Sequence, residues 1–294
     1  MAQPQFIHLD RPSRDDRSAA ALGEDLVGWR AKASVITLTD VENDKRAAKL
    51  GADGWGYYNS PNDDGSDVCG IAWNADLWGR YWSGRKRLTN RTYQLYSGKT
   101  GKKLYACSTV LKYKTTGHTV LVSAVRFPDH VEGDTGFRTD DERWKARKAA
   151  YIGAVQGWRD YVKDLRKRRP TDGVLMVADW NLDWKLGWVQ EQMHAWWSPV
   201  GMKEGWIHLP TKGTFGDRIS DGALYRGMTT SGSEVGSNVS SSDHRPFQTA
   251  FTFLGAHDPE DDGGTEGGGT YGEAWWGFGD YEDDEIYHID TVFS

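Results

Sequence analysis

The stretch that decides the fold is VLMVADWNLDW, Val174 to Trp184. It opens with five small or apolar residues, Val174 to Ala178, and a short unbroken apolar run indicates a strand buried on both faces. An unpaired carboxylate is unstable inside such a core, so the chain should reach the rim of the sheet at Asp179. Open α/β sheets bind ligands at that rim. Asp179 and Asn181 would present an anionic oxygen and a neutral amide there, which suits a magnesium-assisted phosphate site.

The segment before this strand predicts the clearest helix of the chain, Asp140 to Lys167. Acidic residues open it and basic residues close it, as the helix dipole favours, and Pro170 lies just beyond its end. Its apolar residues recur at helical spacing: Tyr151, Val155, Trp158, Val162 and Leu165. A second helix is predicted around Leu22 to Trp29.

Several further segments have the composition of strands or helices. The predicted strands are 5–9, 34–42, 68–73, 104–113, 119–127, 219–226 and 247–254, and the further helices are 43–50 and 190–197. The basic segment 80–91 and the Ser/Gly-rich segment 229–242 are expected to be connections.

The composition is that of a globular protein. Of the 294 residues, 38% are apolar and 27% are charged, which is ordinary for such proteins. There is no run of about 18 apolar residues, so no membrane span is expected. The N-terminal sequence MAQPQFIHLDRPSRDD lacks the apolar core of a signal peptide. We therefore expect a cytoplasmic location, or a place in the virion if the chain is phage-encoded.

The net charge of −6 hides a strong asymmetry. Residues 255–294, the acidic tail, contain twelve Asp or Glu and no Lys or Arg; subtracting these twelve from 42 acidic residues leaves 30 against 36 basic residues in 1–254. A body of net charge +6 with an acidic tail suits a polyanionic substrate and a solubilising or autoinhibitory appendage, although ordinary surface charge explains it equally well. We expect one domain over 1–254, followed by a Gly-rich acidic linker and tail over 255–294.

Acidic motifs follow four of the predicted strands. They are Asp40 with Glu42, Asp179 with Asn181, Asp221, and the pair Asp243-His244. A single Asp at a strand end most often caps a turn or a helix, so each motif alone is weak. Their order along the chain carries more information than any one of them.

In this order the motifs resemble those of the endonuclease/exonuclease/phosphatase superfamily, whose members include deoxyribonuclease I-like enzymes. ADWN (178–181) resembles its Gly-Asp-x-Asn motif, and SSDHRP (241–246) resembles its Ser-Asp-His motif. VITLTDV (35–41) and ISDGAL (219–224) are softer matches to its glutamate strand and to the strand whose Asp orients the catalytic His. The resemblance spans roughly residues 5–254. It implies a four-layered α/β sandwich, with two packed mixed β-sheets flanked by helices.

Two positions depart from the family pattern. The first strand of the family ends in an Asn near the metal, whereas this chain offers only His8 or Asp10 there. Arg126 occupies the His position of the Asn-x-His-Leu motif. An arginine can clamp a phosphate oxygen but cannot release a proton at neutral pH. His130, four residues later, is a candidate substitute that would contact the substrate.

The resemblance implies single-step hydrolysis of a phosphodiester with Mg²⁺ or Mn²⁺ as cofactor. Asp40 or Glu42 would bind the ion, with help from Asp243. Asp179 and Asn181 would position the attacking water and a phosphate oxygen.

His244 would serve as general base or charge stabiliser and would be oriented by Asp221, because imidazole titrates near working pH. Arg126 would contact the phosphate.

Within the superfamily that the chain resembles, it is expected to be a bacteriophage or an actinobacterial member.

DNA is the favoured partner, because the body is basic and the runs 80–91 and 166–169 are rich in arginine. RNA and other phosphodiesters stay open, as does a phosphatase acting on a small phosphorylated substrate, because the loops around such a site select the substrate. A different class is also open: the same fold retained as a binding or structural module, for example in a phage particle. The two departures and the acidic tail favour that alternative.

Three other sites fit the sequence poorly. A calcium loop starting at Asp179 requires Gly at its sixth position and Glu at its twelfth, but these positions hold Trp184 and Gln190. Asp183 is instead expected to cap the next turn. Cys69 and Cys107 lack the spacing of zinc ligands and are expected to be buried apolar residues. Ser-Asp-His within one tripeptide is not a hydrolase triad, whose members come from separate segments.

Overall fold

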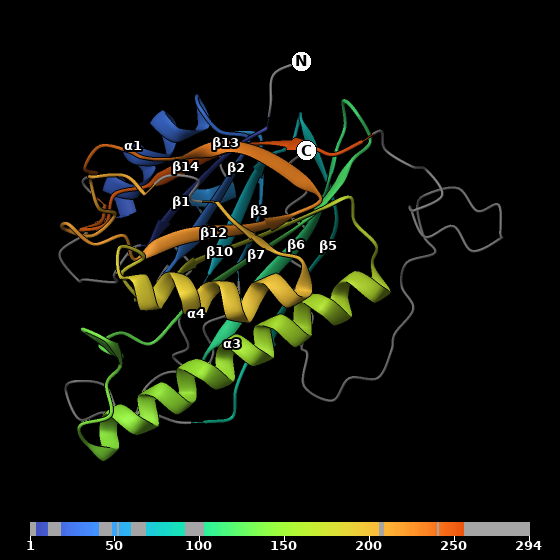
Figure 1. Ribbon diagram of the computed structural model, residues 1–294. Coiled ribbons are helices and arrows are strands. Elements are labelled where there is room, and N and C mark those ends of the chain that lie inside the picture. Colours follow the sequence, from blue (N-terminus) through green and yellow to red (C-terminus); the bar gives the residue numbers. More distant parts are fainter. Residues whose placement is uncertain are drawn as a thin grey trace.

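Two six-stranded β-sheets pack face to face, with helices on both outer sides, in the computed structural model of the chain (Figure 1). The structure describes residues 4–10, 19–40, 49–51, 53–59, 69–91, 103–205, 209–239 and 241–255. This is the predicted four-layered α/β sandwich.

The first sheet is mixed because β1 and β2 run parallel, whereas its other neighbouring strands are antiparallel. Its strands follow the order β13 (Met228–Val235), β14 (Phe247–Phe253), β1 (Gln5–Asp10), β2 (Val35–Thr39), β4 (Gly70–Asn74), β3 (Trp55–Asn59).

The second sheet is also mixed, with β7 and β10 parallel and the remaining pairs antiparallel. Its order is β11 (Lys203–Glu204), β12 (Asp221–Arg226), β10 (Gly173–Asp179), β7 (Thr119–Arg126), β6 (Tyr105–Tyr113), β5 (Trp78–Arg87). A small hairpin, β8 (Glu132–Gly133) and β9 (Gly136–Phe137), stands apart from both sheets.

Helices cover the outer face of each sheet (Figure 1). The helix α1 (Ala19–Arg30) packs on the first sheet, and α3 (Glu142–Arg168) and α4 (Gly187–Trp197) lie on the second. The N-cap of α3 is Asp141, whose carboxylate accepts the backbone N–H of Trp144 at 2.9 Å. The described residues also contain two short 3₁₀ turns, η1 (Lys49–Gly51) and η2 (Ser198–Val200).

The alternation of side chains along β1 explains how the layers form. Ile7 and Leu9 belong to the apolar cluster beneath α1, whereas Phe6 belongs to the core between the sheets. Successive residues of a strand point to opposite faces, so His8 shares the inner face with Phe6. This places a buried imidazole between the two sheets.

Two expected connections are strands instead. The basic segment 80–91 lies largely in β5, and the Ser/Gly-rich segment 229–242 supplies most of β13. Both strands form sheet edges. An edge strand is stabilised by hydrogen bonds along one side and does not need an apolar run, so apolar patterning misses it. The predictions also missed β3.

The other assignments hold within the described residues. The predicted strands at 5–9, 68–73, 104–113, 119–127, 219–226 and 247–254 match β1, β4, β6, β7, β12 and β14, and the helices ahead of and behind β10 match α3 and α4. Cys69 and Cys107 are buried, as expected, and are not joined by a disulfide. The predicted helix 43–50 falls mostly outside the described residues, as does the acidic tail beyond Gly255.

Within the described part of the chain, no helix combines the length and the apolar content that a bilayer crossing requires.

Candidate active site

The register of the second sheet aligns three charged residues at one end. Asp179 is the last residue of β10, where it lies opposite Arg126 on parallel β7 and opposite Asp221 on antiparallel β12. Directly paired residues on neighbouring strands point to the same face. All seven residues of β10 are buried, Asp179 included. The strand that begins at Val174 therefore carries the Asp179 carboxylate to the rim of the sheet, as predicted. At this rim the carboxylate is buried rather than exposed to solvent.

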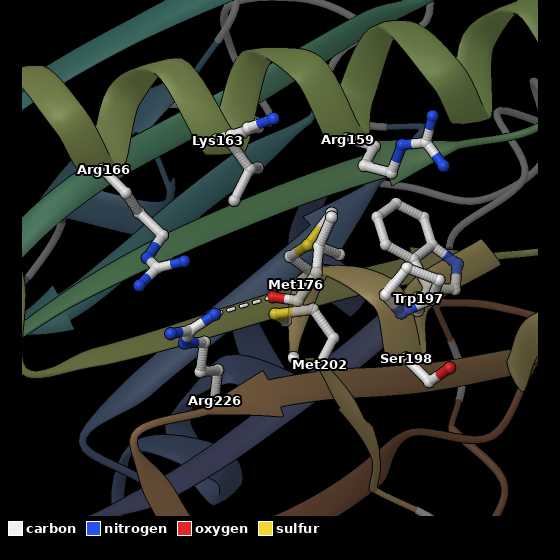
Figure 2. Close-up of a pocket in the computed structure, with 12 residues that line it drawn as sticks. Arg159, Lys163, Arg166, Met176, Trp197, Ser198, Met202 and Arg226 are labelled. Carbon is white, nitrogen blue, oxygen red and sulfur yellow. Dashed lines mark hydrogen bonds between the residues drawn. The ribbon is translucent and has the colours of Figure 1, made fainter.

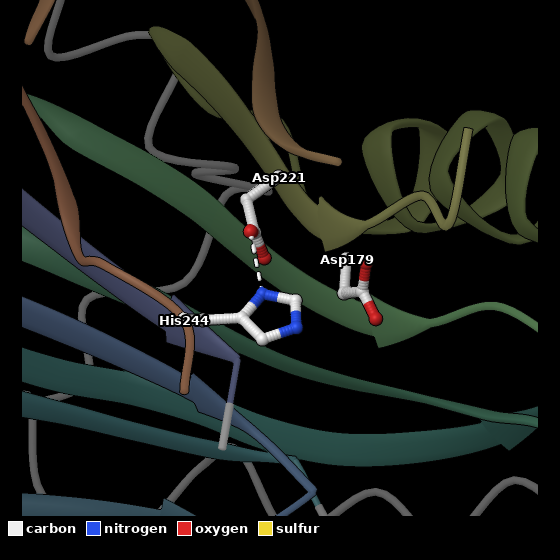
Figure 3. A group of neighbouring side chains, drawn as sticks. All are labelled: Asp179, Asp221 and His244. Carbon is white, nitrogen blue, oxygen red and sulfur yellow. Dashed lines mark hydrogen bonds and ion pairs between the residues drawn. The ribbon is translucent and has the colours of Figure 1, made fainter. Parts of the chain in front are cut away.

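His244 reaches this rim from the segment that leads into β14. Its Nδ1 lies 2.8 Å from Oδ2 of Asp221, and its backbone N–H donates to Oγ of Ser242 at 2.9 Å. Side-chain donor atoms of Asp179, Asp221 and His244 all lie within 4.8 Å of one another. Figure 3 shows the imidazole between the two carboxylates, with Nε2 on the side of Asp179. Residues 65 positions apart in sequence therefore meet.

The surroundings of Asp221 keep its carboxylate ionised. Burial alone raises the pKa of Asp221, but His244, His8 and the hydroxyl of Thr214 together outweigh burial and hold that pKa below its usual value. His8 Nε2 lies 3.7 Å from Oδ1 of Asp221, while its Nδ1 is 2.8 Å from the hydroxyl of Thr37. Asp221 thus faces two imidazoles, one on each carboxylate oxygen.

Asn181 is held by its neighbours in a tight turn after β10. Its backbone N–H donates to Oδ1 of Asp179 at 3.0 Å, and its Nδ2 donates to Oδ2 of Asp179 at 2.6 Å and to the carbonyl of Phe127 at 2.8 Å. Its φ of 51° lies in the left-handed region, which Asn tolerates better than most residues. The motif Asp-x-Asn therefore forms one rigid unit.

The residue between them, Trp180, anchors that unit to the core. Its indole donates to the carbonyl of Gly222 at 3.1 Å, and its own carbonyl accepts the hydroxyl of Tyr151 at 2.7 Å. Burial, followed by the carboxylates of Asp179 and Glu132, raises the pKa of Tyr151 well above its usual value, so the phenol stays a donor. The helix α3 thus fixes the position of the Asp179 turn.

Arg126 lies between two buried carboxylates. Its Nε is 3.5 Å from Oδ2 of Asp179 and its Nη1 is 3.8 Å from Oδ2 of Asp40. Asp40 follows β2 with a φ of 53° and is buried. The two sheets therefore meet here, because Asp40 directly follows β2 of the first sheet and Arg126 ends β7 of the second.

The other residues that the sequence predicts for the site lie at varying distances from the Asp179 cluster. Asp243 directly precedes His244 and is half-buried, and Glu42 lies outside the described residues. His130 is not brought to the cluster: its side chain is 54% exposed and pairs with Asp129 at 3.7 Å. Asp183, as expected, closes a turn, because its Oδ1 accepts the backbone N–H of Lys185 and of Ile219.

Reasoning from sequence missed two neighbours of the cluster. The family pattern makes His8 only a stand-in for an Asn near the metal, whereas its contacts include Asp221 and Thr37. The second is Phe215, whose ring stacks on His244 with centroids 4.8 Å apart; 38% of the residue is exposed. A histidine inside an otherwise apolar strand was the available signal for His8; a lone Phe in a Gly-rich loop carries none.

The charges of the cluster fit a hard divalent cation. Asp40, Asp179 and Asp221 are three buried carboxylates, and Arg126 can balance one of their negative charges. Buried carboxylates need compensating cations. Carboxylate oxygens are the ligands that Mg²⁺ and Mn²⁺ prefer.

The basic run at the end of α3 does not form one surface. Arg168 pairs with Asp164 at 2.7 Å, and the guanidinium of Arg169 lies over the ring of Trp82, 5.2 Å from its centroid. Arg166 points into a cavity on another side of the helix. Successive helical residues are turned by about 100°, so a run in sequence spreads around the helix.

No protein-family model matches the sequence, and no curated protein matches it. Solved structures do match. An endonuclease/exonuclease/phosphatase family protein from Bacteroides thetaiotaomicron has a TM-score of 0.65 at 14% identity, over 87% of this chain and 98% of that one. The B. thetaiotaomicron mannosyl-6-phosphatase Bt3783 has a TM-score of 0.62 at 13% identity, over 85% and 100%.

A third similar structure is that of D. rerio TDP2 complexed with a single-strand DNA product, with a TM-score of 0.57 at 11% identity, over 86% of this chain and 100% of that one. At such identities the likeness establishes the fold. The chain has the fold of endonuclease/exonuclease/phosphatase proteins.

Proposed function

We propose that this chain is a metal-dependent phosphoester hydrolase that cleaves phosphodiesters, with DNA as the favoured substrate. The observation that carries the proposal is the buried Asp221–His244 pair beside Asp179, at the rim where both sheets end. A carboxylate-oriented imidazole next to a second, fixed carboxylate can activate water. The shared fold adds support, since one similar structure is a phosphatase and another was solved with a DNA product.

His244 acts as the proton acceptor. With the Nδ1 proton donated to Asp221, Nε2 is left as the basic nitrogen on the side of Asp179. Nε2 takes the proton of the attacking water as its oxygen bonds to phosphorus, while the P–O bond opposite the water breaks and the leaving oxygen takes a proton from solvent. Asp221 holds the ring in place and stabilises the imidazolium that results.

Asp179, Asn181 and Arg126 orient the reactants. The Asp179–Asn181 unit fixes the attacking water and one phosphate oxygen, because its two side chains are locked together. Arg126 contacts a second phosphate oxygen and balances its charge, but donates no proton. Asp40, Glu42 and Asp243 are the proposed ligands of Mg²⁺ or Mn²⁺. A bound divalent ion would offset the negative charge that builds on the phosphate oxygens.

DNA is favoured over small substrates because of the basic body. The edge strand β5 carries Arg80, Arg85 and Arg87. These arginines are separate from the basic residues at the end of α3. Cationic side chains on an edge can follow a phosphate backbone. A phosphatase acting on a small phosphorylated molecule stays the alternative within the same chemistry, supported by the sugar phosphatase of the same fold.

A catalytically impaired binding or structural module is the alternative of another class. The observation that favours it is Arg126, which lies between Asp40 and Asp179 where a cation would be needed. If Arg126 alone balances these carboxylates, no ion is required and no catalysis follows.

The deciding experiment is hydrolysis by the full chain with Mg²⁺ or Mn²⁺. The substrates are plasmid DNA, single-stranded DNA, RNA, bis-p-nitrophenyl phosphate as a diester and p-nitrophenyl phosphate as a monoester. We expect diester cleavage that chelation abolishes, and a fall of roughly 10² to 10⁴-fold in kcat in His244→Ala and in Asp179→Ala. The matched control is His194→Ala, since His194 lies exposed in the last turn of α4.

Each outcome selects one function. Cleavage of the monoester alone assigns the phosphatase. No cleavage of any substrate with either ion assigns the binding module, and activity that survives His244→Ala refutes the role of the Asp221–His244 pair.

A further inference from the structure

A cavity lies between α3, α4 and the end of β12, and its volume is about 450 Å³ (Figure 2). This is within the range of small-molecule sites, roughly 300–1,000 Å³. Its apolar part includes Met176 of β10, Trp197 of α4, and Met202. Methionine is flexible and polarizable, so such a floor adapts to different apolar groups.

Four basic side chains line the same cavity: Arg159, Lys163, Arg166 and Arg226. No carboxylate of the described residues forms an ion pair with any of them. The nearby acid on α3, Asp164, pairs instead with Arg168. Arg226 donates to the carbonyl of Val200 at 2.8 Å, which holds its guanidinium at the cavity without neutralising it. Within the described part of the chain, nothing neutralises the positive charge of this cavity.

Two of these groups face each other from different elements. Figure 2 shows Arg166 of α3 and Arg226 of β12 pointing toward one another. Burial, followed by the charge of Arg226, lowers the pKa of Arg166. Like charges held close are unfavourable unless an anion lies between them. The arrangement is that of an anion cradle.

This cavity is separate from the Asp179 cluster. Arg226 pairs with Val174 on β10, whereas Asp221 pairs with Asp179. The two ends are thus five residues apart along the strand, roughly 17 Å at 3.3 Å per residue. The cavity and the Asp179 cluster also lie on opposite faces of the sheet. Met176 and Asp179 are three positions apart on one strand, and residues an odd number of positions apart point to opposite faces.

We propose that this cavity binds a small phosphorylated molecule, with the phosphate between Arg166 and Arg226 and an apolar portion against Met176, Met202 and Trp197. A phosphate monoester has the charge to balance two guanidiniums, which bind its oxygens in a bidentate manner. Arg159 and Lys163 supply further charge at the rim. The site is independent of the proposed hydrolysis.

Methionine NMR on the full chain tests the proposal directly. The chain contains five methionines, of which Met176 and Met202 line the cavity whereas Met193 and Met228 are buried in the core elsewhere. With ¹³C-methyl methionine and chelator present, phenyl phosphate should shift the Met176 and Met202 signals only. It should bind more tightly than inorganic phosphate or benzoate, each of which lacks one half of the ligand.

Substitutions at the cradle supply the second readout. Arg166→Gln and Arg226→Gln should each weaken phenyl phosphate binding by about tenfold or more, because a charge-assisted contact is lost. Arg168→Gln is the matched control on α3 and should bind as wild type does. Circular dichroism checks that each variant is folded.

Three results would overturn the proposal. They are no shift of Met176 and Met202 at any phenyl phosphate concentration, equal affinity in the Gln variants, and shifts caused by a single-stranded oligonucleotide but not by phenyl phosphate. The last would assign the cavity to a nucleic-acid backbone.

Discussion

At the residue scale, the site depends on how one carboxylate is shared. Asp221 accepts from His244 on one oxygen and faces His8 at 3.7 Å on the other. Both contacts favour the ionised form, and they outweigh the effect of burial on the pKa. His8 in turn reaches the hydroxyl of Thr37. The polar chain therefore runs from the first sheet through Asp221 to the proposed base.

This sharing predicts a pH-dependent stability. A lowered folded-state pKa means that Asp221 stabilises the fold above its unfolded pKa of about 3.9, and that the stabilisation is lost as pH falls through the lower folded value. Asp221→Asn should lower the free energy of unfolding by on the order of 1–3 kcal/mol at pH 7. The deficit should shrink below about pH 4. Urea unfolding followed by tryptophan fluorescence measures it.

A matched control separates this effect from general carboxylate loss. Asp164→Asn removes an exposed partner of Arg168 on α3. Such surface pairs contribute less than about 1 kcal/mol, so this variant should stay near wild type at every pH. A deficit in Asp221→Asn that is equally large at pH 7 and pH 3 contradicts the prediction.

At the element scale, the register of β10 against β12 and the packing of α3 hold the site in place. A slip of one residue would turn Asp179 and Asp221 to opposite faces. The helix α3 contributes Tyr151 beneath the Asp179 turn. At Gly157, the same helix lies close to the backbone of Leu88, and a Cβ atom on residue 157 would overlap the Leu88 carbonyl.

Two glycine substitutions within helices should therefore have opposite signs. Gly157→Ala should destabilise the chain by about 2 kcal/mol or more, because neither backbone can move aside without breaking packing. Gly28→Ala in α1 should stabilise it by about 0.5–1 kcal/mol, because a Cβ there meets nothing within 4 Å and alanine favours the helix. Thermal unfolding of both variants measures the two effects. If both substitutions changed the stability in the same direction, the close approach of α3 to Leu88 would not explain the effect of Gly157→Ala.

At the scale of the whole molecule, charge is divided between the basic body and the acidic tail. The body over 1–254 has an excess of six basic residues, while the tail has twelve acids and no Lys or Arg. Opposite charges on one chain compete with a polyanion for the same cations. We therefore propose that the tail lowers the affinity of the body for DNA.

Neutralising four tail acids tests this competition. Changing Glu282, Asp283, Asp284 and Glu285 to their amides should raise DNA affinity several-fold at low salt. The gain should fade as salt shortens the Debye length from about 10 Å at 0.1 M to about 3 Å at 1 M. Fluorescence anisotropy with a labelled duplex measures both. Affinity that is unchanged at low salt, or flat against salt in wild type, contradicts a backbone-tracking body.

The sequence by itself determined the local features of this protein. Apolar runs and helical spacing identified β10, α3 and the inner strands, because burial on both faces leaves a continuous pattern. The order of Asp179-x-Asn181 and Asp243-His244 pointed to the fold and to most of the cluster. Only the tertiary structure decided which strands form edges, since β5 and β13 depend on a neighbour's hydrogen bonds rather than on their own patterning. It also decided that Asp179 stands opposite Asp221, that His8 faces that carboxylate, and that Arg166 meets Arg226 across a cavity. These are contacts between segments far apart in the chain, and their geometry is set by strand register and helix packing, which no local pattern encodes.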